Sequence, residues 1–111
     1  MLPSKPLDIA LILDIRESVS LVGDYVAGLS EDQFKTDLLR RDASAFRLLL
    51  IGEAVSKLSA DVTGRLPEID WRGMISLRHR LAHDYGSTNF SVVWTIVSND
   101  VPALDRALKD L

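Results

Sequence analysis

Apolar residues at intervals of three and four mark a long helix near the start of the chain. Between Leu7 and Ala27, charged and small polar residues separate these apolar positions, which are Leu11, Ile15, Val19, Val22 and Val26. This spacing places the apolar side chains on one face of an α-helix. Gly28 should end the helix. Ser30-Glu31-Asp32-Gln33 then matches a capping box, which predicts a short helix or turn.

The pattern predicts a second long helix from about Asp37 to Leu58. Its run Leu48-Leu49-Leu50-Ile51 covers most of the circumference of a helix at about 100° per residue, so the segment should be covered on more than one side. The following Gly52-Glu53-Ala54 places two small residues around one acid. Such small residues allow another backbone to approach closely, at a propensity cost of about 1 kcal/mol for glycine. Glu53 is either a solvated charge or a buried partner for an arginine.

Turn-forming residues separate this helix from a third one. The stretch from Ser59 to Pro67 contains a glycine and a proline and is interpreted as a loop. Asp70 is then the N-cap of a helix from Trp71 to about Tyr85. Gly86 is expected to end that helix.

Helical spacing of apolar residues continues through the last part of the chain. From Asn89 to Leu111 the spacing is mostly helical, and Pro102 fits near a new helix start after Asn99-Asp100. The sequence shows neither the alternation of a strand nor a repeat or linker. We therefore expect an all-α, up-and-down bundle of four to five helices in a single domain, residues 1–111.

Length and composition support one core and favour pairing. The chain has 111 residues, of which 47% are hydrophobic, enough for a core in one domain. A helical chain this short with apolar residues on several faces often completes its burial by association. We expect a homodimer.

Composition argues against several classes of protein and of site. The chain has no cysteine, which excludes disulfides, thiolate metal sites and a cysteine nucleophile. Its longest apolar runs are far shorter than the ~20 residues of a membrane span, and the N-terminus does not have the pattern of a signal peptide. A soluble cytoplasmic protein with no membrane partner is expected.

The charge of the chain limits how it could bind nucleic acid. The formal net charge is -3 and the pI is about 5.2, which argues against a broad electrostatic grip on nucleic acid. Positive charge is nevertheless concentrated in one part of the sequence, at Arg65, Arg72, Arg78 and Arg80. A small local contact with an anion is the expectation.

The most chemically varied cluster is Arg78-His79-Arg80-Leu81-Ala82-His83-Asp84-Tyr85. It combines a titratable base, cations and a modifiable hydroxyl. On an ideal helix, His79 and His83 share one face and Arg78 and Tyr85 share another. Arg78 and His83 are then about 140° apart, so a loosened last turn or a second subunit would help to bring them to one substrate.

This cluster allows more than one interpretation. A histidine that exchanges a proton and an arginine that holds a phosphate suffice to cleave RNA without a metal, because the RNA 2′-hydroxyl is an internal nucleophile. The same cations could instead only stabilise the negative end of a helix dipole. His79 and His83 form half of a zinc site, for which no third ligand is evident. Trp71 and Trp94 are interpreted as core anchors.

The sequence resembles the HepT-like toxins of the HEPN superfamily. Their motif is an arginine, four to six residues, a histidine and, two residues later, a tyrosine, and Arg78, His83 and Tyr85 match it. The likeness covers most of the chain. It includes three further segments: Arg47 to Ala54, Trp71 to Met74, and Val93-Trp94.

The resemblance implies a helical homodimer in which two copies of the motif line one cleft that cleaves RNA without a metal or other cofactor. His83 would be the general base or acid, and Arg78 would bind the scissile phosphate. His79 occupies a position where asparagine is common and could add a second proton-transfer group, and Glu53 is a further supporting candidate. A toxin-antitoxin pair is also implied, in which an MntA-type nucleotidyltransferase transfers AMP to Tyr85.

A second hypothesis from another functional class uses the same residues. The chain would be a non-catalytic helical binding subunit of a nucleotidyltransferase, with Arg78 and His83 holding a nucleotide or RNA without cutting it. The two hypotheses share a fold and differ in the expected effect of His83→Ala. A catalyst loses turnover and keeps its affinity for RNA, whereas a binding subunit loses affinity or nothing.

Overall fold

The computed structural model describes residues 5–111, which contain helices and turns and no strand. The α-helices are α1 (Pro6–Val26), α2 (Glu31–Thr36), α3 (Leu38–Lys57), α4 (Ala60–Arg65), α5 (Trp71–His83), α6 (Phe90–Thr95) and α7 (Val101–Lys109). A 3-10 turn η1 (Tyr85–Ser87) follows α5, and a π-helical turn η2 (Ile96–Asp100) joins α6 to α7. The all-α prediction is confirmed. Residues 1–4 of the predicted domain lie outside the described residues.

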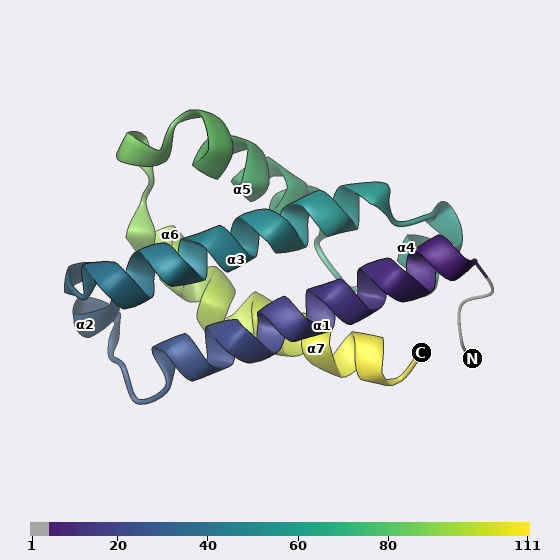
Figure 1. Cartoon of the computed structure of the whole chain (residues 1–111), viewed down its shortest axis with the longest axis horizontal. Helices are drawn as coiled ribbons and strands as arrows, with labels where there is room; N and C mark the ends of the chain where they lie inside the picture. Colours follow the sequence, from purple (N-terminus) through teal and green to yellow (C-terminus); the bar gives the residue numbers. More distant parts are fainter. Residues whose placement is uncertain (1–4) are drawn as a thin grey trace.

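Helix α3 is the centre of the bundle. It packs against α1 on one side and α5 on the other, while α7 packs against α1 and α2 contacts both α3 and α6 (Figure 1). This arrangement explains the apolar run of α3. Leu48 and Ile51 are buried and Leu49 and Leu50 are partly buried, as expected of a helix covered on two sides.

The core is formed by the apolar positions that the periodicity identifies. Ile15 and Val22 of α1, Val93 of α6 and Leu104 of α7 are fully buried. Gly28, which follows α1, has a φ of 76°, the left-handed conformation that glycine adopts easily. The predicted α1 and its end are confirmed. No helix of the described chain is long and apolar enough to cross a membrane.

Helix α2 begins with the predicted capping box. The Ser30 amide donates to Gln33 Oε1 at 2.9 Å, and the Gln33 amide donates to Ser30 Oγ at 3.2 Å. The helix buries Phe34, whose ring centroid lies 6.5 Å from that of Phe90 and 5.2 Å from that of Trp94. The capping box therefore positions an aromatic residue that joins α2 to α6.

The predicted loop from Ser59 to Pro67 is wrong, because residues Ala60–Arg65 form helix α4. Val62 is fully buried, so tertiary packing stabilises a segment whose glycine and proline indicated a loop. Buried Asp8 of α1 accepts hydrogen bonds from the Ser59 amide and hydroxyl, at 3.0 and 2.6 Å, which lower the pKa of Asp8. Trp71 Nε1–H donates to the carbonyl oxygens of Thr63 and Leu66.

The predicted end of the third long helix is also wrong. The N-cap prediction is confirmed, since the Asp70 carboxylate accepts from the Gly73 amide at 3.0 Å. However, α5 ends at His83, and Asp84 is its C-cap. Gly86 lies inside the 3-10 turn and does not have a positive φ, so it does not supply the left-handed cap that its sequence position indicated.

The C-terminal helix continues through a π-helical turn. Residues on both sides of η2 keep right-handed helical angles, so α6 and α7 form one helical segment. Pro102 is the second residue of α7, near the predicted helix start. Proline has no N–H group to donate to the carbonyl four residues before it. The changed hydrogen-bond pattern of a π-helical turn accommodates this missing hydrogen bond.

Helices α3 and α5 meet most closely at Gly52. A Cβ atom added there would lie 2.4 Å from Arg78 Cβ and 2.8 Å from the backbone oxygen of Met74. Real Cβ atoms do not approach other atoms so closely. The predicted close approach at Gly52 is confirmed, and the neighbour that approaches carries the arginine of the candidate cluster.

We expect Gly52→Ala to lower the free energy of unfolding by up to about 2 kcal/mol. Alanine gains about 1 kcal/mol in helix propensity, but the overpacked contact with α5 costs about 1–3 kcal/mol and displaces backbone. Gly23→Ala is the matched control, since an added Cβ would meet nothing within 4 Å there. It should raise the free energy of unfolding by up to about 1 kcal/mol. Urea denaturation of both variants measures this, and equal effects would contradict the close approach.

Candidate active site

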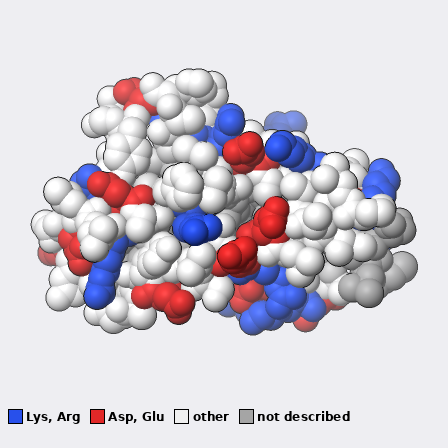
Figure 2. All heavy atoms as spheres, in the orientation of Figure 1, with Lys and Arg blue, Asp and Glu red and all other residues white. Residues whose placement is uncertain are grey.

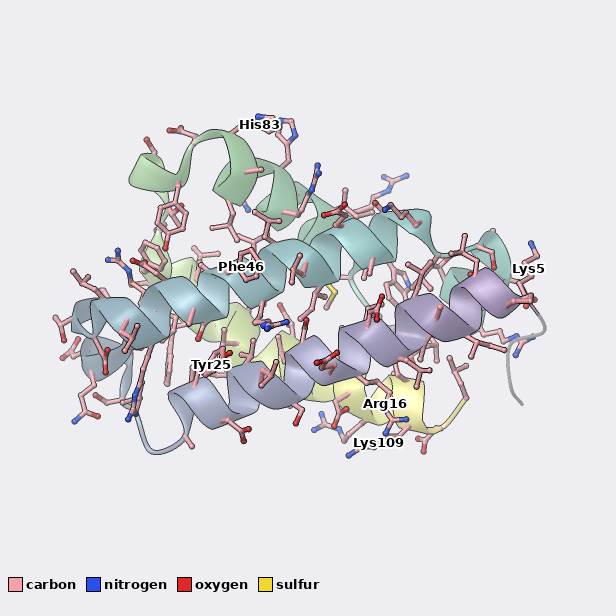
Figure 3. The ribbon with its side chains drawn as sticks, viewed as in Figure 1. Lys5, Arg16, Tyr25, Phe46, His83 and Lys109 are labelled. Carbon is pink, nitrogen blue, oxygen red and sulfur yellow. The ribbon has the colours of Figure 1, made fainter. Side chains whose placement is uncertain are left out.

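The two histidines lie together on the outer side of α5. The ring centroids of His79 and His83 are 4.5 Å apart with an angle of 49° between the rings, and both residues are exposed. Figure 3 shows His83 projecting outward from the last turn of α5, away from α3. The prediction that these residues share a face is confirmed. Both imidazole rings are therefore open to solvent.

Arg78 lies on the side of α5 that packs against α3. Its stem lies over Gly52, and the residue is partly buried. The Nε atom is buried and has no hydrogen-bond partner among the described residues. A buried donor without an acceptor costs about 1–3 kcal/mol. The guanidinium group as a whole is only partly buried, and a guanidinium is a suitable ligand for an anion such as phosphate.

Tyr85 follows the end of α5 and turns back toward the N-terminal half of α3. Its hydroxyl donates a hydrogen bond to Asp42 Oδ1. Its ring meets that of Phe90 edge to face at a centroid distance of 5.7 Å. Asp42 also accepts from Arg41 Nε at 3.0 Å, and the Arg41 guanidinium lies over the Phe90 ring at 4.2 Å. Tyr85 is thus held at both its ring and its hydroxyl.

The contact between Tyr85 and Asp42 shifts the pKa of both groups. Partial burial, followed by the hydrogen bond to Asp42, raises the pKa of Tyr85 to about 12. The hydrogen bond from Tyr85 lowers the pKa of Asp42. At neutral pH, the phenol is therefore protonated and the carboxylate is charged.

The motif residues of one chain point to different places. Gly52, beneath Arg78, and Asp42, beside Tyr85, are ten residues apart on α3, which corresponds to about 15 Å along its axis. His83 projects from the other side of α5 (Figure 3). One copy of the chain therefore does not gather Arg78, His83 and Tyr85 around a single point.

Glu53 lies away from this cluster, in a groove between α1 and α3. Its carboxylate is 3.6 Å from Lys57 Nζ, and its side chain is 43% exposed. Arg47 borders the same groove, a cavity of about 370 Å³, but no ion pair joins Glu53 to an arginine among the described residues. Of the two interpretations of Glu53, the structure favours the solvated charge.

The arginines near the cluster differ in their environments. Arg65 pairs with Asp61 at 3.0 Å, whereas Arg80 is exposed and borders two cavities of about 130 and 360 Å³ between α5 and the C-terminal helices. Figure 2 shows acidic and basic side chains interspersed over α1 and α3, without a continuous basic surface on that face. This distribution fits a local contact with an anion.

Metal-ligand chemistry at the histidine pair is limited to two residues. Within residues 5–111, no group of three or more histidine, aspartate, glutamate or cysteine residues could hold a metal ion. His79 and His83 would supply two ligands at most from one chain. Proton transfer is the chemistry for which the pair is better suited.

Sequence reasoning missed Asp42 and Arg41. They precede Tyr85 by more than 40 positions, and no short motif connects them to it. The missing signal is geometric: because α5 ends before Tyr85, the tyrosine leaves the face that it would have on an ideal helix. Only the packing of the 3-10 turn against α3 places its hydroxyl at Asp42.

Comparisons with known proteins agree over most of the chain. Residues 15–111 match the model of the family described as "Ribonuclease HepT-like". A Methanocaldococcus jannaschii protein provisionally named an RNase is 33% identical over 106 residues, which cover 92% of this chain and 88% of that protein. The "Probable ribonuclease HepT" of Thermococcus cleftensis is 32% identical over 98 residues, covering 88% and 89%. No solved structure is significantly similar.

The contact between Tyr85 and Asp42 predicts a pH-dependent contribution to stability. The raised pKa of Tyr85 contributes stability that is complete below pH 10 and is lost as the pH rises through about 12. The lowered pKa of Asp42 contributes stability that is present above pH 3.8 and is lost as the pH falls below it. The stability difference between wild type and Tyr85→Phe should therefore be largest between these limits and shrink on both sides.

Urea denaturation of the two proteins across this pH range measures the difference. Tyr25→Phe is the matched control, because Tyr25 is also partly buried but has no carboxylate partner among the described residues. Its stability difference from wild type should not follow the same profile. A pH-independent difference for Tyr85→Phe would contradict the hydrogen bond to Asp42.

Proposed function

This chain belongs to the HepT-like ribonuclease family, and on this premise we propose that it is a metal-independent endoribonuclease that acts as the toxin of a toxin-antitoxin pair. RNA would bind at the end of α5 and be cleaved by residues of the Arg78–His83–Tyr85 motif. The observation that carries the proposal is the arrangement of side chains on α5. The partly buried Arg78 lies on the same short helix as two exposed histidines, so one helix offers both a phosphate ligand and proton-transfer groups.

The proposed reaction uses the 2′-hydroxyl of the RNA as the nucleophile. His83 would take the proton of this hydroxyl as the oxygen attacks the neighbouring phosphorus atom. Arg78 would hold the phosphate and stabilise the additional negative charge of the pentacoordinate phosphorane. The bond from phosphorus to the 5′-oxygen then breaks, and that oxygen must receive a proton. No step in this sequence requires a metal ion.

His79 is the candidate for the second proton transfer. Its ring centroid lies 4.5 Å from that of His83, so two imidazoles are within reach of one phosphate group. One could act as the base while the other, protonated, acts as the acid for the 5′-oxygen. Glu53, in the groove between α1 and α3, would support the site only through the packing and charge of α3.

The proposal includes a homodimer, because one chain separates the motif residues. Arg78 faces α3, whereas His83 projects into solvent. A second copy related by two-fold symmetry could bring its own α5 beside the first, so that arginine and histidine from different copies meet in one cleft. Exposed apolar residues, including Phe46 at 56% and Ile75 at 37%, are available for such a contact.

Control of the toxin is proposed to act through Tyr85. A nucleotidyltransferase antitoxin of the MntA type would transfer AMP to the Tyr85 hydroxyl. The added group would bring negative charge and bulk to the motif, where it would compete with the RNA phosphate for Arg78. This control requires that the acceptor hydroxyl remain accessible, and Tyr85 is only partly buried.

The test is RNA cleavage by the purified protein in the presence of a metal chelator. His83→Ala should lower the cleavage rate by roughly 10²–10⁴-fold while leaving thermal unfolding and RNA affinity near those of wild type, because it removes a proton-transfer group from an exposed position. Arg78→Ala should also lower the rate strongly. Arg106→Ala, at an exposed position of α7, is the matched arginine control and should cleave as wild type does.

Three results would count against the proposal. A folded His83→Ala protein that cleaves RNA at the wild-type rate would exclude His83 as a catalyst. If His83→Ala loses affinity for RNA and wild type does not cleave RNA, the binding-subunit hypothesis is favoured. Cleavage that stops in chelator and returns with a divalent ion would exclude the metal-independent reaction. In a bacterial host, expression of wild type should arrest growth and fragment RNA, and His83→Ala should do neither.

A further inference from the structure

Four side chains form a cluster around the proposed acceptor tyrosine, which we call the acceptor cluster: Arg41, Asp42, Tyr85 and Phe90. Arg41 and Asp42 come from the first turns of α3, Tyr85 from η1 and Phe90 from the start of α6. The cluster thus joins the start of α3 to two neighbouring segments that follow it by more than 40 residues. Its members include one hydroxyl, one carboxylate and one guanidinium in mutual contact.

The hydroxyl of Tyr85 has a fixed direction. The edge-to-face contact with Phe90, at a centroid distance of 5.7 Å, holds the ring, and the hydrogen bond to Asp42 Oδ1 directs the proton of the hydroxyl toward that carboxylate. The lone pairs of the oxygen then point elsewhere. Since Tyr85 is only partly buried, an electrophile can approach the oxygen while its proton remains directed at Asp42.

A phenol in this environment needs a base in order to react. The raised pKa of Tyr85, about 12, leaves almost no phenolate at neutral pH. In nucleotidyl transfer from ATP, a bond forms between the tyrosine oxygen and the α-phosphorus, and the bond from the α-phosphorus to the bridging oxygen breaks. Pyrophosphate leaves with the electron pair of that bond. The phenolic proton must be removed as the new bond forms, when the phenol becomes much more acidic.

Asp42 is the group in place to receive this proton. Its carboxylate already accepts the hydrogen bond from Tyr85, and its side chain is 49% exposed, so the proton can pass on to solvent. After transfer, the tyrosine oxygen has no proton to donate, and the new phosphodiester adds a negative charge near Asp42. Arg41, 3.0 Å from Asp42 and in contact with Phe90, is the cation that can balance this added charge.

We propose that Asp42 is the proton acceptor for nucleotidylation of Tyr85, and that Arg41 holds the phosphate that this reaction adds. The inference rests on the proposed control by AMP transfer and names the residues of this chain that would carry it out. The modified protein, and not only the antitoxin, would thereby contribute to its own inactivation. Arg41 would release Asp42 and bind the new phosphodiester instead. This contact would keep the AMP group close to η1.

The test measures AMP transfer from ATP to the full chain by a purified MntA-type nucleotidyltransferase, with intact mass as the readout. Asp42→Asn should slow the transfer by roughly 10²-fold or more with little change in KM for the chain, because a proton acceptor is lost while the binding surface remains. Asp24→Asn, the same change at an exposed position of α1, is the matched control and should react as wild type does. Tyr85→Phe should accept no AMP.

The pH profile separates proton transfer from a merely structural role. The wild-type rate should be nearly constant above the pKa of Asp42. The Asp42→Asn rate should rise about tenfold per pH unit toward the pKa of Tyr85, because only the ionised phenol then reacts. Asp42→Glu should restore the flat profile at a reduced rate, and it decides the question if thermal unfolding shows that Asp42→Asn is not folded.

The outcomes distinguish this inference from the function on which it rests. An Asp42→Asn protein that accepts AMP at the wild-type rate and with the wild-type pH profile would overturn the role of Asp42 and leave control through Tyr85 intact. Wild type that accepts no AMP, or Tyr85→Phe that still accepts it, would overturn both the control and the inference. RNA cleavage by wild type without ATP tests the ribonuclease separately from either result.

Discussion

The close packing of α5 against α3 at Gly52 is the constraint on which the candidate site depends. Because Gly52 has no side chain, the stem of Arg78 and the backbone of Met74 can lie directly on α3. This contact fixes the rotation of α5 about its axis. Once Arg78 is directed at α3, the periodicity of the helix directs His79 and His83 outward, into solvent. One glycine therefore determines which side chains of α5 are partly buried and which lie in solvent.

The same rotation separates the motif residues of one chain. Arg78 is partly buried and lacks a partner for its Nε–H, the histidines are exposed, and Tyr85 is bound to Asp42 further along α3. A site that needs an arginine and a histidine on one phosphate must then take them from two copies, or move the last turn of α5. The division has a further consequence for control. Tyr85 lies in a cluster of its own, so the proposed AMP transfer to it would depend on Arg41 and Asp42 and not on the histidines.

Sequence periodicity predicted most of the fold because its signals are local. The face of α1, the end of that helix at Gly28 and the capping box of α2 each depend on residues within a few positions of one another. Helix α4 was not predictable in this way, since it is stabilised by the burial of Val62 in the hydrophobic core and not by its own composition. The end of α5 was misplaced because Gly86 indicated a cap that the backbone does not use.

In the candidate site too, local features could be predicted from the sequence and long-range contacts could not. The shared face of His79 and His83 follows from their spacing on one helix, and the structure confirms it. The partner of Tyr85 could not be predicted, because an ideal helix places Tyr85 beside Arg78, whereas the chain leaves the helix at His83 and turns to Asp42. Where two segments distant in sequence meet, the spacing of residues within one segment does not predict the contact between them.

The central claim is that two copies of the chain share each active site, and mixing two inactive variants tests it most directly. Arg78→Ala and His83→Ala proteins, each without ribonuclease activity, would be combined under conditions that allow dimers to exchange. If arginine and histidine come from different copies, half of the dimers regain one of their two sites, and about a quarter of the wild-type cleavage rate should return. If the mixture stays as inactive as its components while exchange is demonstrated, the shared site is contradicted.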